Sequence, residues 1–468
     1  MFDLLIKGAH VVDPLNHVNG KADVAVKDGK IAAVGRDLTG DAKEIVDFSG
    51  YVLQPGIIDS HVHLGSMWGS PYGARMLAMK GVTTCLDMAG PLEDILDKVP
   101  EYGAGINMAI LQFASPPFTF KNDHPTKSEM EALIDKSLDD GALGVKLLGG
   151  HYPLKPDVSS LLIKTALERR AYVAWHAGTS EHGSNIEGMQ EAVAMADGYP
   201  LHLAHINAYC RGAIKNELEE VAIAIDLLKK NPNIFCESYI SPKNGTRLTC
   251  DETGKIQSKV TGNCLRKFGF SEDRDGVKKA ILAGKAFVVY DAGGYSDLMT
   301  GEEALKLWED AGTNVGGSFN VNPSMPRIML AEAKRDDGSF VVDAISTDGG
   351  CIPRNVILSQ GLSLVKLDIL SLSEFAQKTS LNPARMLRLT TKGHLSVGAD
   401  ADMTIYDYAT QEPKATFVEG RKVLWDGKVI AKGATVICTE RGKEAIEKRG
   451  MKAVVVDPGR QVERVKAL

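Results

Sequence analysis

Residues 55–63 read PGIIDSHVH, and the fold of the chain is best inferred outward from this stretch. Pro55 and Gly56 end the segment before it, and the apolar run that follows is typical of a buried strand. Side chains two residues apart on a strand share a face, so His61 and His63 point the same way near its carboxyl end. Neutral imidazoles are common metal ligands, and a chance H-x-H in a surface strand is the alternative.

The chain around this motif alternates predicted strands and helices. Strands are expected at residues 57–61, 83–87, 108–113, 144–148, 172–176, 201–205, 234–238 and 341–346, and helices between several of them. This alternation predicts an α/β protein with a (β/α)8 TIM barrel over residues 55–388. The gap before the last strand is too long for a simple crossover, so residues 240–338 are expected to form an insertion over the barrel mouth.

Both ends of the chain are rich in short strands. Asp-Gly pairs at residues 28–29 and 426–427 are hairpin signals between such strands. We therefore expect residues 1–54 and 389–438 to form one small β-sandwich domain. Residues 439–468 are predicted to be a charged, partly helical C-terminal tail.

Composition narrows the class of protein. The 468 residues are 44% hydrophobic and 24% charged, which is ordinary for a large globular protein. A net charge of -6 with no basic stripe argues against a nucleic-acid partner. Asp3 and the lack of a long apolar run predict no signal peptide and no membrane span, hence a cytoplasmic protein. The seven cysteines lack any CxxC pair and are expected to be reduced, with a Cys250–Cys264 pair as the alternative.

Four further candidate ligands lie on predicted strands or shortly after them. Lys146 lies in GVKLL, where burial disfavours its charged form; reaction with carbon dioxide would give an anionic carbamate, and a snorkelling lysine is the alternative. His176 and His205 each lie at a strand-to-loop junction, whereas His202 is expected to be structural. Asp348 follows the last strand, where it could bind a metal and take a proton from water. Each candidate is weak alone, but their order on five separate strands is hard to produce by chance.

These motifs resemble the amidohydrolase superfamily, in its binuclear branch with a carboxylated lysine. Residues 28–35 (DGKIAAVG), 382–389 (NPARMLRL) and 393–402 (GHLSVGADAD) extend the resemblance over almost the whole chain. The resemblance implies two divalent cations, with zinc as the default and manganese, nickel or cobalt as alternatives, and a homodimer or homotetramer. It implies that Asp348 is also the proton shuttle. The implied ligands are His61, His63 and Asp348 for one metal, His176 and His205 for the other, and the Lys146 carbamate as the bridge.

The strand-end sequences GVK, HAGTS, HIN and STDGG are most similar to D-aminoacylases and isoaspartyl dipeptidases. The complete H-x-H and Lys146 also fit hydantoinases and dihydroorotases, and Cys85 lies inside a predicted strand, unlike the cysteine ligand of many deacylases. The expected activity is metal-dependent hydrolysis of a non-peptide amide bond of a small molecule, an N-acyl-D-amino acid first and a cyclic amide as the alternative. Deaminases carry H-x-x-E, which none of the eleven histidines begins. A non-catalytic scaffold that kept this fold is a further alternative, but such proteins usually lose their metal ligands.

Three residues are candidate substrate contacts. Tyr152 follows Lys146 by six residues and could stabilise an oxyanion, as a tyrosine does in hydantoinase-type enzymes; a plain loop aromatic is the alternative. Arg211 and Arg354 follow the sixth and eighth strands and could pair with a substrate carboxylate. Ordinary surface arginines are the alternative for both.

Overall fold

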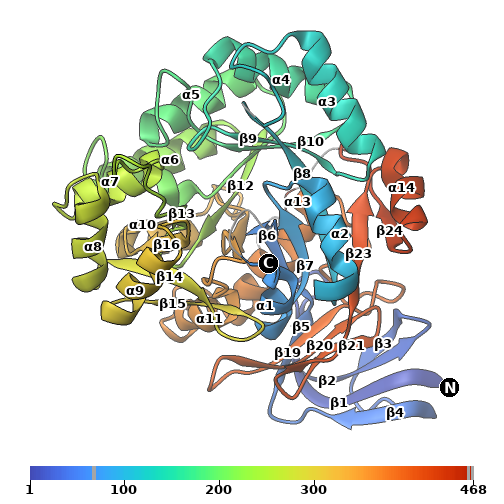
Figure 1. Ribbon diagram of the computed structural model, residues 1–468. Coiled ribbons are helices and arrows are strands. Elements are labelled where there is room, and N and C mark those ends of the chain that lie inside the picture. Colours follow the sequence, from blue (N-terminus) through green and yellow to red (C-terminus); the bar gives the residue numbers. More distant parts are fainter. Residues whose placement is uncertain (66–69, 117, 461–463, 465–468) are drawn as a thin grey trace.

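The computed structural model describes residues 1–65, 70–116, 118–460 and 464. A parallel barrel with helices around it forms most of the molecule, and a second sheet made from both chain ends lies beside it, at the bottom of Figure 1. None of the helices within the described ranges combines the length and the apolar character that crossing a membrane requires.

The barrel confirms the predicted fold. Its strands follow the order β17-β12-β11-β10-β9-β8-β7-β6-β18, and neighbours run parallel. The eighth strand is broken in two: its first piece pairs with β12 and its second with β6, which closes the barrel. The strands are β6 (Ile57–His63), β7 (Val82–Asp87), β8 (Ala104–Ala114), β9 (Gly144–Leu148), β10 (Tyr172–His176), β11 (Leu201–Leu203), β12 (Ile234–Tyr239), β17 (Ala344–Ser346) and β18 (Gly349–Gly350).

Helices cover the outside of the barrel and bury their apolar sides against its strands. Local signals explain where two of them begin. Thr126 and Glu129 form a reciprocal capping box at the start of α3, and the Asn216 side chain caps α6. The helices are α1 (Gly73–Met79), α2 (Leu92–Tyr102), α3 (Lys127–Asp139), α4 (Pro156–Glu168), α5 (Ile186–Ala196), α6 (Glu217–Lys230), α10 (Ser324–Glu332), α11 (Ile357–Lys366), α12 (Leu372–Ala376) and α13 (Asn382–Met386).

The domain predicted from both chain ends is one continuous sheet with its own apolar core. Strand β5 joins the two ends, because it pairs with β1 on one side and β19 on the other. Both predicted Asp-Gly turns have two consecutive positive φ angles, as tight hairpins require. The strands are β1 (Phe2–Asp13), β2 (Val18–Lys27), β3 (Lys30–Gly35), β4 (Ala42–Asp47), β5 (Val52–Pro55), β19 (Met403–Asp407), β20 (Glu412–Val418), β21 (Arg421–Trp425) and β22 (Lys428–Val429).

The last part of the chain returns to the barrel. Strand β23 (Gly433–Cys438) pairs with β8, although the sequence suggested the terminal domain for these residues. After α14 (Lys443–Lys448), strand β24 (Lys452–Val455) pairs with β23. The predicted tail therefore includes an ordered strand and helix, and its residues 461–463 and 465–468 lie outside the described residues.

The long segment before the last barrel strand forms a separate layer with a small apolar core of its own. Its four strands pair in the order β13-β16-β14-β15. Helix α10 then packs against the barrel helix α6, so the chain returns to the barrel before it forms the last strand. The elements of this insertion are β13 (Thr246–Arg247), α7 (Lys259–Lys267), α8 (Arg274–Leu282), β14 (Ala286–Asp291), β15 (Ser296–Met299), α9 (Glu302–Asp310) and β16 (Gly316–Phe319).

Candidate metal centre

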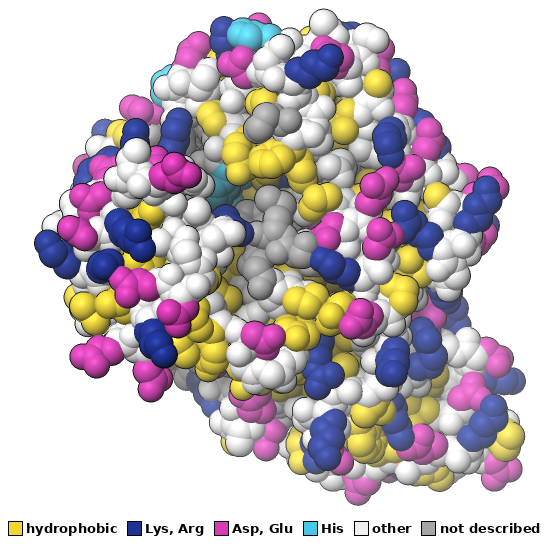
Figure 2. Space-filling model, in the orientation of Figure 1, with side chains coloured by type: hydrophobic (Ala, Val, Ile, Leu, Met, Phe, Trp, Pro, Cys, Tyr) yellow, Lys and Arg dark blue, Asp and Glu magenta, His cyan; other side chains and the backbone are white. Residues whose placement is uncertain are grey.

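A cavity of about 900 Å³ opens at the carboxyl ends of the barrel strands. Figure 2 shows a hollow on this face of the molecule, with histidine visible inside it. The insertion contributes to its lining through α7. All six predicted ligands and both candidate arginines line it, namely His61, His63, Lys146, His176, His205, Asp348, Arg211 and Arg354.

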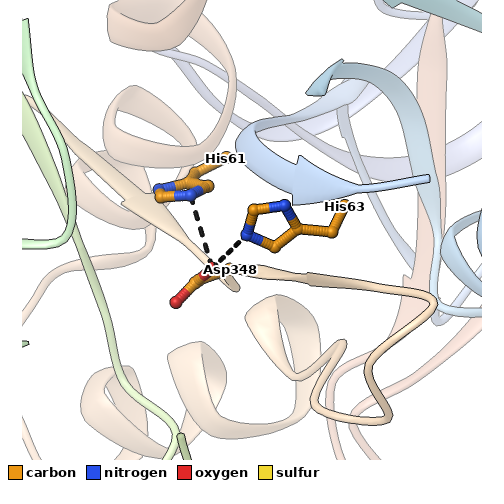
Figure 3. Close-up of side chains that lie close together, drawn as sticks. All are labelled: His61, His63 and Asp348. Atoms are coloured by element: carbon orange, nitrogen blue, oxygen red, sulfur yellow. Dashed lines mark hydrogen bonds and ion pairs between the residues drawn. The ribbon is translucent and has the colours of Figure 1, made fainter. Parts of the chain in front are cut away.

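Three of the predicted ligands form a tight group (Figure 3). The end of β6 supplies His61 and His63, and the break between β17 and β18 supplies Asp348. Asp348 Oδ1 lies 2.8 Å from His63 Nε2 and 3.3 Å from His61 Nε2. Their ligand atoms all lie within 4.8 Å of one another, which is close enough to surround one cation.

The two other histidines lie beside this group. His176 Nδ1 and His205 Nε2 are 3.1 Å apart, and the His205 ring stacks on His61 with 5.1 Å between ring centroids. Strand β11 ends at Leu203, so His205 lies two residues beyond the strand, directly before a short 3-10 helix (Ile206–Tyr209), rather than ending the strand as predicted. His202 instead lies with its Nδ1 2.8 Å from the Tyr172 hydroxyl and does not line the cavity, in keeping with its predicted structural role.

Burial keeps the imidazoles of His61, His176 and His205 neutral. It lowers the pKa of His61 and His176 well below the usual histidine value, and that of His205 to about 3. Neutral rings offer a nitrogen lone pair to a cation at neutral pH. His205 Nδ1 is also buried without a hydrogen-bond partner among the described residues. The donor set therefore fits divalent cations.

Lys146 is buried at the floor of the cavity, at the middle of β9. Its Nζ lies 3.0 Å from the sulfur of Met88. Burial lowers its pKa, while the charges of Glu237 and Asp348 act in the opposite direction. A lowered pKa increases the fraction of neutral amine, which is the form that reacts with carbon dioxide. The snorkelling alternative is wrong, because the side chain is only 1% exposed.

Arg354 holds the carboxylate of Asp348. Its Nη2 lies 2.6 Å from Asp348 Oδ2, and its Nε donates to the Asp348 carbonyl at 2.6 Å. Burial alone would raise the pKa of Asp348, but the charge of Arg354 leads the interactions that outweigh it and hold the pKa well below its usual value. The surface alternative is wrong for Arg354, which is only 3% exposed.

The other two candidate substrate contacts, Arg211 and Tyr152, lie differently relative to the cavity. Arg211 is half-buried in the lining, and it donates to Asn322 Oδ1 and to the Tyr239 hydroxyl, each at 2.7 Å. Tyr152 is not among the described residues that line the cavity, and its ring packs edge-on against Phe118. An oxyanion role for Tyr152 therefore stays a prediction.

Sequence reasoning missed Glu237, a fully buried residue on β12. Its Oε1 lies 2.6 Å from His61 Nδ1 and accepts a hydrogen bond from the His205 backbone N–H, also at 2.6 Å. The Ser346 hydroxyl donates to its other oxygen. A carboxylate that orients ligand imidazoles is a usual outer partner of a metal site. The signal was present, because an acidic residue interrupts the otherwise uncharged strand IFCESY.

The seven cysteines are free thiols, as predicted, and the alternative Cys250–Cys264 pair does not form. Cys264 instead accepts a hydrogen bond from Asn244 at 3.2 Å. Cys85 is buried in the apolar core and does not line the cavity. Cys264 lines the cavity but is not one of the predicted ligands, which are histidines, a lysine and an aspartate.

The fold agrees with comparisons to known proteins. The closely matching curated relatives include an allantoinase of Escherichia coli O1:K1, 47% identical over 92 residues, which are 19% of this chain and 20% of the allantoinase. The match thus spans about a fifth of that relative. Among solved structures, an N-acyl-D-glutamate deacylase from Bordetella bronchiseptica has a TM-score of 0.67 at 16% identity, over 92% of this chain and 98% of that one.

Two more solved structures share the fold. A D-aminoacylase has a TM-score of 0.65 at 18% identity, over 93% of this chain and 99% of that one. A D-hydantoinase has a TM-score of 0.60 at 16% identity, over 93% of this chain and 98% of that one. The amidohydrolase family model matches residues 52–436. Because that match covers most of this chain, the chain belongs to the amidohydrolase family.

Proposed function

We propose that this protein is a metal-dependent hydrolase of carbon–nitrogen bonds other than peptide bonds. The observation that carries the proposal is the convergence of six candidate metal ligands, which lie on or directly after five separate strands, in one cavity. Membership of the amidohydrolase family supports it. A barrel of this kind forms its active site at this end.

The described residues fit two divalent cations. Zinc is the proposed metal, with manganese, nickel or cobalt as alternatives that imidazole and carboxylate ligands also accept. Bound cations would supply Lewis acidity, which makes water more acidic and polarises a carbonyl oxygen. We assign His61, His63 and Asp348 to one cation, His176 and His205 to the other, and a carbamate on Lys146 to the bridge.

The protein's own residues then handle the proton. Asp348 faces the cavity as a carboxylate, so it can accept a proton from the attacking water and pass it to the leaving nitrogen. Arg354 fixes the orientation of that carboxylate and keeps it ionised before the reaction. Glu237 holds the His61 ring in place from behind.

The charge of the lining supports an N-acyl-D-amino acid as the substrate. Arg211 from the barrel and Lys259, Arg266 and Lys267 from α7 make this part of the cavity cationic. Such a lining suits the free carboxylate of an N-acyl amino acid, with Arg211 as the proposed contact and Arg354 as a second. The fold shared with N-acyl-D-glutamate deacylase and D-aminoacylase agrees with this class.

A cyclic amide is the second candidate substrate. The 92-residue likeness to allantoinase favours it. In this case Tyr152 would stabilise the oxyanion, which requires its loop to bring the hydroxyl to the cavity.

A substrate screen tests the proposal. The metal-loaded protein is assayed with N-acyl-D-amino acids, isoaspartyl dipeptides, hydantoins, dihydropyrimidines and allantoin, while the metal content is measured by mass spectrometry. We expect about two ions per chain and hydrolysis of at least one N-acyl-D-amino acid. Hydrolysis of cyclic amides alone would make them, rather than N-acyl-D-amino acids, the favoured substrate class. A metal-free protein that still hydrolyses these amides would refute the proposal.

Assembly as a homodimer or homotetramer and a cytoplasmic location stay predictions. Light scattering on the purified protein measures the first, and cell fractionation the second.

A further inference from the structure

A second cavity, of about 510 Å³, lies at the other end of the barrel. The guanidinium of Arg388, in its lining, stacks over Tyr172 at 5.2 Å and Phe235 at 5.0 Å, which lie at the starts of β10 and β12. The metal ligand His176 ends β10, so the barrel separates the two cavities. Strand β24 and the end of α3 form part of its border, at the right of Figure 1. Five arginines line it, namely Arg169, Arg170, Arg388, Arg441 and Arg460.

Three of these arginines already have carboxylate partners. Arg169 Nε and Arg441 Nη1 contact Asp135 of α3 at 3.1 and 2.8 Å, and this carboxylate is not part of the lining. Arg170 pairs with Asp457, which does line the cavity. Glu440 is the second acidic residue of the lining.

The two other arginines lack such partners. Within the described ranges, no carboxylate lies at ion-pair distance from Arg388 or Arg460. Arg388 is only 9% exposed, and its hydrogen bonds go to the carbonyls of Met386 and Arg460 and to the Tyr172 side chain, whereas Arg460 is exposed. Buried cations are normally paired, so an anion is the missing element here.

An orphaned hydroxyl points to the same conclusion. Thr439 lines the cavity and is 8% exposed, yet its Oγ1 has no hydrogen-bond partner among the described residues. Buried polar groups are nearly always hydrogen-bonded, so an unpaired one indicates a ligand or solvent in contact with it.

We propose that this second cavity binds a small organic phosphomonoester. The phosphate group carries close to two negative charges and matches two unpaired guanidinium groups, whose fork geometry suits its oxygens. The Thr439 hydroxyl donates to a third oxygen. The cavity is of the size that takes a whole small-molecule ligand, and Leu138, Val456 and Pro458 provide apolar surface for the organic part.

Calorimetric titration of the full-length, metal-loaded protein tests this site, with inorganic phosphate and adenosine 5′-monophosphate as probes. We expect one saturable site that binds the monoester more tightly than phosphate. Arg460→Gln and Thr439→Val should each weaken binding, about tenfold for the arginine, whose charge-assisted hydrogen bond is lost. Arg36→Gln is the matched control, because Arg36 is exposed on the terminal sheet, and it should bind as wild type does.

Phosphate could also bind at the metal centre, so His61→Asn is titrated in parallel. Binding that disappears in His61→Asn and persists in Arg460→Gln would overturn the proposal, as would the absence of saturable binding at millimolar phosphate. Thr439→Ser retains the hydroxyl and should bind normally, which separates loss of the donor from loss of folding. Thermal melts of every variant accompany the titrations. The inference is independent of the proposed substrate.

Discussion

Two of the proposed metal ligands have left-handed backbone. His205 has a φ of 37° and Asp348 a φ of 51°, a conformation that costs about 1–3 kcal/mol for residues other than glycine. Hydrogen bonds hold both in place: the Asp348 N–H donates to the His61 carbonyl at 2.9 Å, and the His205 N–H donates to Glu237. These backbone hydrogen bonds of the barrel thus fix the positions of both side chains.

Glu237→Gln tests this positioning at the scale of one residue. An amide cannot accept as strongly from both His61 and His205, so we expect metal affinity to fall by about 10–100-fold. Competition with a chelator measures it. Glu220→Gln is the matched control, since Glu220 is equally buried but accepts only from backbone N–H groups of the loop after β11. An equal loss of affinity in both variants would contradict the role of Glu237.

Lys146→Ala removes the proposed bridge between the cations. We expect no measurable hydrolysis and fewer than two bound ions, because the bridging anion is lost. Acetate or propionate should restore part of the activity, and sodium chloride at the same ionic strength serves as the control. Full activity in the unsupplemented variant would exclude a carbamate at this position.

At the scale of elements, a buried ion cluster joins the C-terminal flank to the barrel. Lys392 is 2% exposed, and its Nζ lies 3.0 Å from Asp400 and 2.7 Å from Asp402. Asn107 of β8 donates to the same oxygen of Asp402 at 2.9 Å. The run GADAD therefore links the terminal sheet to a barrel strand, which is why its acidic residues are needed in the fold.

Lys392→Met removes the buried charge shared by Asp400 and Asp402 and leaves Asp402 without an ion-pair partner among the described residues, so we expect the free energy of unfolding to fall by about 3 kcal/mol in urea titrations. Lys30→Met is the control: Lys30 also pairs with Asp400 but is half exposed, so its loss should cost under about 1 kcal/mol. Similar losses from the two variants would contradict a special role for the buried lysine.

The pairing of Asp400 with Lys392 makes the stability of the protein depend on pH. Burial would raise the pKa of Asp400, but Lys392 and Lys30 outweigh it and lower the pKa below 3.8. A lowered folded-state pKa stabilises the protein above the unfolded pKa, and this stabilisation is lost as the pH falls through the folded value. The stability difference between wild type and Lys392→Met should therefore shrink below about pH 4, measured by urea titration.

At the scale of the whole molecule, the substrate cavity joins the barrel and the insertion. Lys267 of α7 donates to the Arg211 carbonyl at 2.9 Å, and Arg211 in turn donates to Asn322 beyond the insertion's last strand. If Arg211 binds the substrate as proposed, recognition depends on how this layer sits over the proposed metal centre.

Arg211→Met tests recognition across this boundary. If Arg211 binds the substrate carboxylate in both ground and transition states, KM should rise at least about tenfold while kcat changes little. An N-acyl amine that lacks the carboxylate should be hydrolysed equally by both proteins. A fall in kcat with unchanged KM would instead assign Arg211 to the reaction itself.

The barrel and its ligands could be predicted from local patterns. Strand periodicity places His61 and His63 on one face, and parallel strands bring their carboxyl ends together, so Lys146 and His176 had to lie near them. Long-range contacts could not be predicted this way. The acidic residue in the strand IFCESY marks Glu237 as unusual, but the sequence alone does not show that its side chain reaches His61, 176 positions away.

The sequence by itself determined the barrel, the order of the proposed metal ligands and a terminal β domain built from both chain ends, because each follows from periodicity, turn chemistry and strand direction. Only the tertiary structure decided the rest. It showed that Arg354 is a buried partner of Asp348, that β11 ends before His205, and that α7 makes the substrate cavity cationic. These features arise where distant segments meet in space, so they depend on packing rather than on local sequence.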